Sequence, residues 1–177
     1  LLEVAEAFSK MKKKPRRSIV FAWVTAEEKG LIGSEYYTQN PVFPLKNTLA
    51  NINLDMVGRS GEKELVSFTN PEKSLAGPNG IYIISDDQSS EITKISNKIC
   101  TDLNLIPSDA LTEDFMESSD QYNFHKKGIP VLGVTTGLHE DYHHPTDDFD
   151  KIDYHKMKRI ADHTFLVTYE IANRKKR

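Results

Sequence analysis

Residues 18–34, SIVFAWVTAEEKGLIGS, contain an apolar run that ends on two consecutive carboxylates. Residues 19–25 are rich in β-branched and aromatic side chains, and apolar residues occupy both odd and even positions. This pattern predicts a strand that is covered on both faces within an α/β sheet. Glu27 and Glu28 follow this run directly, so we expect them at the carboxyl end of the strand. In open α/β sheets this is the edge where ligands bind.

The two glutamates also stand at the start of a predicted helix. Gly30 and Gly33 allow the backbone to turn sharply before a helix over residues 34–39. Carboxylates in the first turn of a helix are stabilised by the helix dipole and are usually solvated. From this stretch alone, both a ligand-binding pair and a solvated helix start remain open.

The composition is typical of one globular domain with a sizeable core. The chain has 177 residues, of which 38% are hydrophobic and 28% charged. A net charge of -3 gives no reason to expect a nucleic-acid partner, and the basic run at residues 10–17 is typical of a solvated helix end. The single cysteine, Cys100, excludes an intrachain disulfide and is predicted to lie in the core. No apolar run reaches the ~18 residues that a membrane-spanning helix needs.

Strands and helices alternate along the rest of the chain, which predicts an α/β domain. The predicted strands are residues 49–56, 63–68, 81–84 and 131–135. The predicted helices are residues 1–8, 92–103 and a final helix after Asp153 as N-cap. Residues 107–124 show no clear period and are expected to be irregular. The stripe expected to pack the final helix comprises Met157, Ile160, Ala161, Thr164, Phe165, Thr168 and Ile171.

Residues of types that are able to bind a metal follow three of the predicted strands. Glu27 and Glu28 follow the first and Asp55 ends the second, while the loop 137–150, GLHEDYHHPTDDFD, follows the last. One imidazole and two carboxylates are ligands that Zn²⁺ takes in catalytic sites, which keep a position for water. A further carboxylate can take the proton of that water. Each residue alone has a simpler interpretation, because Asp55 suits a turn and a loop histidine such as His143 is usually a surface residue.

Taken together, four motifs carry a resemblance to a known family. AEE-KGLIGS, NINLDM-G, SSD-F with GIP, and YHHPTDDFDKID occur in this order over nearly the whole chain. The chain thereby resembles the zinc-dependent exopeptidase family of bacterial leucyl-type aminopeptidases, which includes the glutamate carboxypeptidase II type. The resemblance implies a three-layer α/β domain with a central mixed sheet and helices on both faces. Residues 1–177 would form a single domain, the C-terminal part of a catalytic domain whose N-terminal strands are missing.

The resemblance also implies roles for individual residues. Glu27 would be the general base that deprotonates the metal-bridging water and later protonates the leaving amine. Glu28 and His143 would bind one zinc ion, and Asp55 would bind the other. Tyr142 would hydrogen-bond the oxyanion of the tetrahedral intermediate.

Other positions match the family motifs only in part. Asp120 and Asp147 match acidic positions, for which the resemblance implies a supporting or loop-ordering role. His144 stands where threonine or serine is usual, Gln121 where histidine often follows Ser-Asp, and Asp148 where threonine is frequent. These substitutions leave the three predicted ligands in place.

The resemblance further implies that part of the metal site lies outside this sequence. The family takes another histidine and a bridging aspartate from an His-x-Asp segment and a Gly-Ala-x-Asp-Asn-like stretch, and neither occurs here. The sequence also begins in mid-helix at Leu1 without an initiator methionine, which indicates the later part of a longer polypeptide. We therefore expect this segment alone to bind zinc weakly, or at one site, and to be nearly inactive.

The expected function is removal of N-terminal residues from peptides that have a free N-terminus. Family members are often exported, so an extracellular or periplasmic location is expected, while the oligomeric state is not predicted. Two alternatives remain: a non-catalytic binding module on the same scaffold, as in the transferrin-receptor ectodomain, and a glutaminyl-cyclase-like acyltransferase with one zinc ion.

Overall fold

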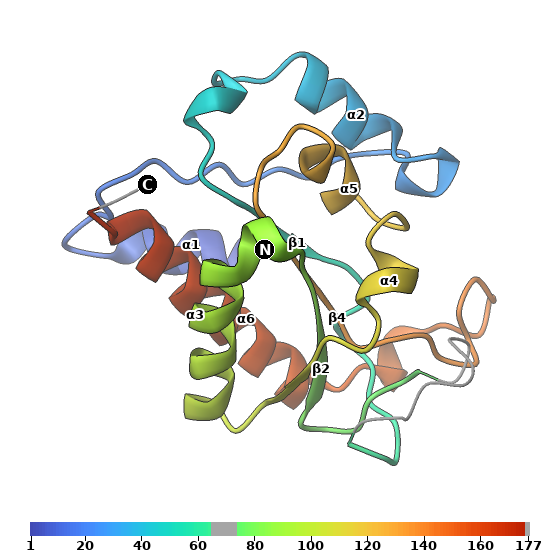
Figure 1. Cartoon of the computed structure of the whole chain (residues 1–177). Helices are drawn as coiled ribbons and strands as arrows, with labels where there is room; N and C mark the ends of the chain where they lie inside the picture. The colour runs from blue at the N-terminus through green and yellow to red at the C-terminus, as the bar shows by residue number, and fades with distance from the viewer. Residues whose placement is uncertain (65–73, 176–177) are drawn as a thin grey trace.

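The computed structural model describes residues 1–64 and 74–175 and contains a four-stranded mixed sheet. The strands β1 (Asn51–Leu54), β2 (Gly80–Ile84), β3 (Ile106–Ser108) and β4 (Val131–Thr135) have the order β1-β4-β2-β3 (Figure 1). β1 runs parallel to β4, whereas β2 runs antiparallel to β4. The carboxyl ends of β1 and β4 therefore meet at one edge of the sheet, as the candidate site requires.

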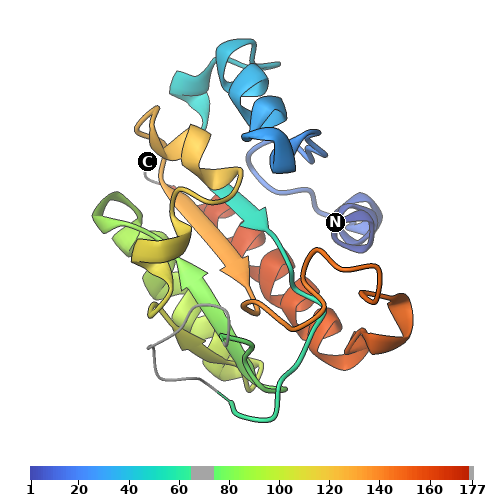
Figure 2. The same ribbon diagram turned by 90° about the vertical axis from the view of Figure 1, so that its right-hand side faces the viewer.

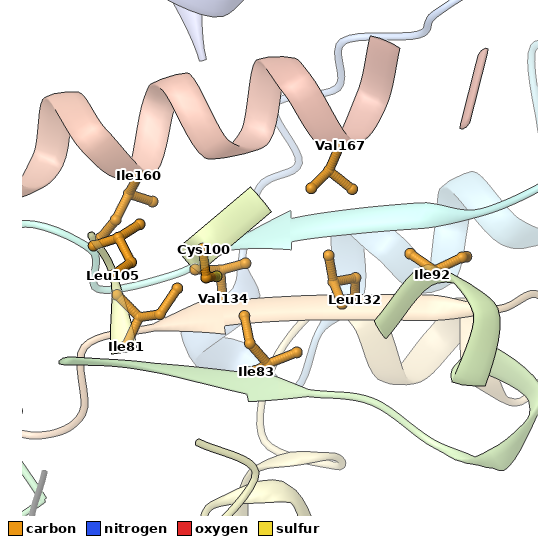
Figure 3. Packing of buried hydrophobic residues seen from close by; sticks show 9 residues of the cluster. All are labelled: Ile81, Ile83, Ile92, Cys100, Leu105, Leu132, Val134, Ile160 and Val167. Carbon is orange, nitrogen blue, oxygen red and sulfur yellow. The ribbon is translucent and has the colours of Figure 1, made fainter. Parts of the chain in front are cut away.

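The main core lies between the sheet and the helices α3 (Ser90–Asp102) and α6 (Tyr154–Asn173) (Figure 3). Side chains alternate between the two faces of a strand, so Ile83 belongs to this core while Tyr82 and Ile84 belong to a second cluster. The prediction that Cys100 is a core residue is confirmed, since it is fully buried. The buried members of the main core are Ile81, Ile83, Ile92, Cys100, Leu105, Leu132, Val134, Ile160 and Val167.

Helices cover both faces of the sheet, which confirms the predicted three-layer α/β fold class. α1 (Leu2–Lys10) packs beside α6, with the rings of Phe8 and Phe165 4.4 Å apart. The short helices α4 (Thr112–Phe115) and α5 (Gln121–His125) lie in front of the sheet in Figure 2, whereas α6 lies behind it.

The interpretation of residues 107–124 as irregular is wrong. These residues include most of β3, all of α4 and all but the last residue of α5. The two helices have four and five residues, which is too short to produce a recognisable helical period. β3 pairs with β2 alone among the described strands, and Pro107 is tolerated there because an edge strand leaves one side unpaired.

The strand predicted at residues 19–25 does not form among the described residues either. None of the described strands pairs with this segment, which links α1 to the glutamate turn as a long loop (Figure 1). A strand needs a neighbouring segment to accept and donate its backbone hydrogen bonds. Without one, Val20 and Trp23 remain 46% and 60% exposed. Most of the other unconfirmed strand, at residues 63–68, lies outside the described residues.

The segment nevertheless has a defined end against α2 (Ile32–Gln39). The amide of Gly33 donates a hydrogen bond to the carbonyl oxygen of Thr25 at 2.9 Å. A Cβ atom at Gly33 would lie 2.3 Å from that same oxygen, so only glycine permits this approach. Gly33 therefore fixes the first turn of α2 beside the end of the apolar run.

α6 begins after Asp153, whose carboxylate accepts a hydrogen bond from the Lys156 amide at 2.9 Å, so the predicted N-cap is confirmed. Its predicted stripe is only partly correct, because two ionisable residues lie on the buried face. The Lys156 ammonium donates to three backbone carbonyl groups, and the His163 Nε2 atom lies 2.9 Å from the Ser96 hydroxyl. The buried residues of α6 are Lys156, Ile160, His163, Thr164, Val167 and Ala172. No helix in the described ranges is both long and apolar enough to cross a membrane.

Candidate active site

The two glutamates lie in a tight corner made by the short 3₁₀ helix Glu27–Lys29. Ala26 on one side and Gly30 on the other have φ values of 56° and 100°, both in the left-handed region. Two left-handed residues reverse the chain on each side of the turn. The predicted glycine turn is therefore present, with Ala26 as an additional left-handed residue that the sequence pattern does not predict.

Asp55 lies at the adjacent corner, directly after β1. Its amide donates to the carbonyl oxygen of Val134 at 3.1 Å, which extends the pairing of β1 with β4. Its carboxylate oxygen Oδ2 accepts a hydrogen bond from the Ser119 hydroxyl at 2.6 Å. Sequence reasoning did not identify Ser119 as a site residue, although it directly precedes Asp120 in the Ser-Asp motif. This contact fixes the orientation of the Asp55 side chain.

His143 lies in the loop after β4 and reaches the glutamate corner. Its Nε2 atom is 2.7 Å from Oε1 of Glu28, a contact between residues 115 positions apart. Its ring stacks on that of Tyr142, with centroids 3.7 Å apart and planes inclined by 24°. His143 also has a positive φ of 60°, which turns the backbone at this point. The loop thus presents the imidazole and the phenol side by side next to Glu28.

Negative charge accumulates at this edge of the sheet. Burial raises the pKa of Glu27 to about 7, and the nearby carboxylates of Asp55, Glu28 and Asp120 add to this increase, whereas His143 opposes it. The pKa of the Tyr142 hydroxyl is raised by burial and then by the charges of Glu28, Glu27 and Asp55. A carboxyl group that retains its proton near neutral pH indicates a site rich in uncompensated negative charge.

The predicted ligands come together only in part. Glu28 and His143 are in contact, and Asp55 is near enough for its charge to raise the pKa of Glu27. Within residues 1–64 and 74–175, however, no three His, Cys, Asp or Glu side chains form a group that could hold a metal ion. The arrangement is thus one imidazole–carboxylate pair with a separate carboxylate beside it. This donor set and its negative charge fit a divalent cation such as Zn²⁺.

The remaining motif residues have varied surroundings. Burial raises the pKa of Asp120, and a hydrogen bond with Ser34 opposes this shift. Gln121 is 2% exposed and accepts a hydrogen bond from Asn53 at 2.7 Å, so it is a core residue. His144 and Asp148 are exposed, and Asp148 accepts a hydrogen bond from the Phe149 amide.

A cavity of about 780 Å³ lies at this edge of the sheet. The cavity also reaches Arg59, a further residue that the sequence pattern did not identify, whose guanidinium pairs with Asp141 and Asp147. The predicted site residues that line it are Glu27, Glu28, Asp55, Tyr142, His143 and Asp147. Apolar side chains complete the lining, including Met56, Ile84, Phe115, Val134, Leu138, Phe149 and Ile152. A mostly apolar cavity with a few convergent polar groups is the usual form of a site for small molecules or peptide ends.

Comparisons with known proteins identify the family of the chain. The profile described as peptidase family M28 matches residues 1–168. Aminopeptidase YwaD of Bacillus subtilis is 29% identical over 185 residues, a match that covers 100% of this chain and 36% of YwaD. The chain therefore spans about a third of the length of this relative.

Solved structures show the same fold. The zinc aminopeptidase BSAP of Bacillus subtilis superposes with a TM-score of 0.73 at 24% identity, covering 99% of this chain and 40% of BSAP. The glutaminyl cyclase of Porphyromonas gingivalis has a TM-score of 0.61 at 18% identity, covering 96% of this chain and 59% of the cyclase. At these identities the likeness establishes the fold alone. The chemistry has to be inferred from the residues of the site.

Proposed function

Since the chain belongs to peptidase family M28, we propose that it carries part of the active site of a zinc-dependent aminopeptidase. The reaction would be hydrolysis of the first peptide bond of a peptide by water. The observation that carries this proposal is the 2.7 Å contact between His143 and Glu28. It joins an imidazole and a carboxylate from distant parts of the chain beside a second glutamate, Glu27.

The residues present are suited to hold zinc. Glu28 and His143 would hold one ion, and Asp55, which already accepts a hydrogen bond from Ser119, would hold the other. When bound, zinc acts as a Lewis acid and lowers the pKa of its water to near neutral. The closely placed carboxylates support this assignment, because a cation would neutralise the charge that they accumulate.

The side chains beside these ligands would perform the proton transfers and stabilise the transition state. Glu27 would take the proton of the attacking water and pass it to the leaving amine, as a general base and then a general acid. Tyr142 keeps its hydroxyl proton at neutral pH, because burial and nearby carboxylates raise its pKa. It would donate a hydrogen bond to the oxyanion of the tetrahedral intermediate.

The substrate class follows from the proposed reaction. An aminopeptidase acts on peptides with a free N-terminus, and the end of such a peptide would enter the cavity lined by Glu27, Glu28 and Asp55. An extracellular or periplasmic location remains a prediction from the resemblance.

We further propose that this segment requires additional strands of the same catalytic domain. Two observations support this: the apolar residues 19–25 lack a strand partner in the described chain, and the site assembles fewer than three convergent metal ligands there. A strand that pairs with this segment would end near the glutamate corner, where it could add ligands.

Glu27→Gln in the full-length enzyme tests the assignment of the general base. The amide cannot accept the proton of the water, so kcat on an aminoacyl anilide is expected to fall by about 10²–10⁴-fold. The zinc content, measured by atomic absorption, is expected to stay at the wild-type level. Glu28→Gln is the matched variant and is expected to lower the zinc content as well. Wild-type turnover by Glu27→Gln would contradict the assignment.

Two other functions make different predictions for the full-length protein. A glutaminyl-cyclase-like transferase would cyclise an N-terminal glutamine peptide, whereas an aminopeptidase would release the glutamine, and mass spectrometry distinguishes the products. A non-catalytic binding module would contain no stoichiometric zinc. Retention of Glu27, Glu28, Asp55 and His143 supports the aminopeptidase over the binding module.

A further inference from the structure

Arg59 connects the end of β1 to the loop that carries His143. Its Nη2 atom lies 2.5 Å from Asp141 Oδ2, and its Nη1 atom lies 2.6 Å from Asp147 Oδ1. Asp141 precedes His143 by two residues and Asp147 follows it by four. The guanidinium, whose side chain is 16% exposed, therefore holds the loop on both sides of the imidazole.

The loop has little regular structure to hold it in place. Its backbone hydrogen bonds join Tyr142 to His139, His144 to Asp141 and Asp147 to His144, so they close successive turns inside the loop. The side chains of residues 143–150 are exposed. Local turns of this kind shape a loop but do not attach it to the rest of the molecule. In this protein, side chains such as Arg59 make that attachment.

The backbone around Arg59 is itself fixed to the start of α6. The carbonyl oxygen of Gly58 accepts from the Asp153 amide at 2.8 Å, and the Ser60 hydroxyl donates to the Asp153 carboxylate at 2.6 Å. The fully buried Lys156 ammonium donates to the Arg59 carbonyl oxygen at 3.2 Å. Arg59 thus reaches the loop from a rigid base.

We propose that Arg59 is a positioning residue that holds His143 in place to meet Glu28 without touching the metal. The proposal rests on the proposed function, because it assigns His143 as a zinc ligand. Residues that orient a ligand typically change metal affinity 10–100-fold when they are replaced. The principal alternative is that Arg59 binds a carboxylate of the substrate. Pairing with Asp141 and Asp147 argues against this, since both carboxylates already occupy the guanidinium.

The test compares zinc affinity in the full-length enzyme, with Arg59→Met against wild type. Competition with a chromophoric chelator is expected to show zinc bound about 10–100-fold more weakly by Arg59→Met. Arg59→Lys, which keeps one charged contact, is expected to recover part of the loss. Arg174→Met is the matched control, because Arg174 pairs with Glu91 at the far end of α6 and should leave zinc affinity unchanged.

The other possible results of this experiment contradict the proposed role of Arg59 or support its alternative. Wild-type zinc affinity in Arg59→Met overturns the proposal. If KM rises at the same time for dipeptides but not for their C-terminal amides, Arg59 binds the substrate carboxylate instead. If Arg59→Met fails to fold, Asp147→Asn removes one of the two ion pairs at a half-exposed position, and unchanged affinity there also overturns the proposal. A wild-type enzyme that binds no zinc refutes the proposed function itself.

Discussion

Three non-glycine residues at the candidate site have positive φ angles: Ala26 at 56°, Met56 at 53° and His143 at 60°. Ala26 precedes Glu27, Met56 follows Asp55, and His143 is itself a predicted ligand. The left-handed conformation costs about 1–2 kcal/mol for an L-residue, because Cβ approaches the following carbonyl oxygen. Strain of this kind concentrates at functional sites, where surrounding contacts hold it in place. Here the three residues precede, follow or are themselves candidate ligand or base residues of the site.

Ala26→Gly tests this cost at one corner. Glycine relieves the left-handed strain but gives the unfolded chain more freedom, so we expect a net gain of roughly 0.5–1 kcal/mol in the free energy of unfolding. Urea denaturation monitored by circular dichroism measures it. Ala22→Gly, four residues earlier and without a positive φ, should show no gain. A loss of stability in Ala26→Gly as large as that in Ala22→Gly would show that Ala26 is unstrained.

At the scale of elements, the buried face of α6 is the clearest case where local pattern and packing differ. His163 is fully buried and lies 2.9 Å from the Ser96 hydroxyl of α3. Burial lowers its pKa to about 4, since the cationic form would lose its hydration. The packing of α3 against α6 therefore requires His163 to be in its neutral form.

This histidine predicts a pH dependence of stability. The folded state keeps His163 neutral down to about pH 4, whereas the unfolded chain protonates it near its ordinary pKa of 6.5. Stability is therefore lost as pH falls from about 6.5 to 4, by up to about 3 kcal/mol. His163→Gln, which cannot titrate, should lose less stability over this range in urea titrations. His155→Gln, on the exposed side of α6, should behave as wild type.

These elements show which parts of the fold can be predicted from sequence. β2 and β4 were predictable because they are short apolar runs bounded by turn residues, and β1 because polar and apolar residues alternate along it. The burial of Lys156 and His163 was not, because it depends on three backbone carbonyl groups and a hydroxyl from distant segments. The strand predicted at residues 19–25 depends in the same way on a partner that the described chain does not supply.

The same distinction between local sequence pattern and distant contacts applies to the candidate site. Asp55 and His143 could be identified as candidates because they follow strands, and Glu27 and Glu28 because they follow an apolar run; all four match motifs. Arg59 could not, since its contacts reach across 82 and 88 positions of the sequence. Sequence patterns thus locate candidate ligands more readily than residues proposed to position them.

At the scale of the whole molecule, the candidate site lies at one edge of the sheet that the described residues form. β1 lies at the end of the strand order, with Asp55 at its carboxyl end. Residues 19–25, which lead to Glu27 and Glu28, lie outside the sheet. Asp55 and the Glu27–Glu28 pair are therefore held near each other by loop contacts, chiefly the contact of His143 with Glu28, rather than by strand pairing.

This predicts that the 177-residue chain alone is a poor enzyme. We expect it to bind zinc weakly or at one site, because few ligands converge in the described chain, and to hydrolyse aminoacyl anilides at a small fraction of the full-length rate. Calorimetric zinc titration and a chromogenic assay measure both quantities, with the full-length enzyme as the reference. Robust hydrolysis by the 177-residue chain would contradict this view and show that its own residues suffice.

Trp23 gives the unpaired segment an optical signature. It is the only tryptophan in the chain, and the residue is 60% exposed. Its fluorescence should therefore resemble that of indole in water, and it should shift to shorter wavelength when a neighbouring strand excludes the solvent. A shift in the emission of Trp23 would therefore report, without any label, that an additional strand has paired with residues 19–25.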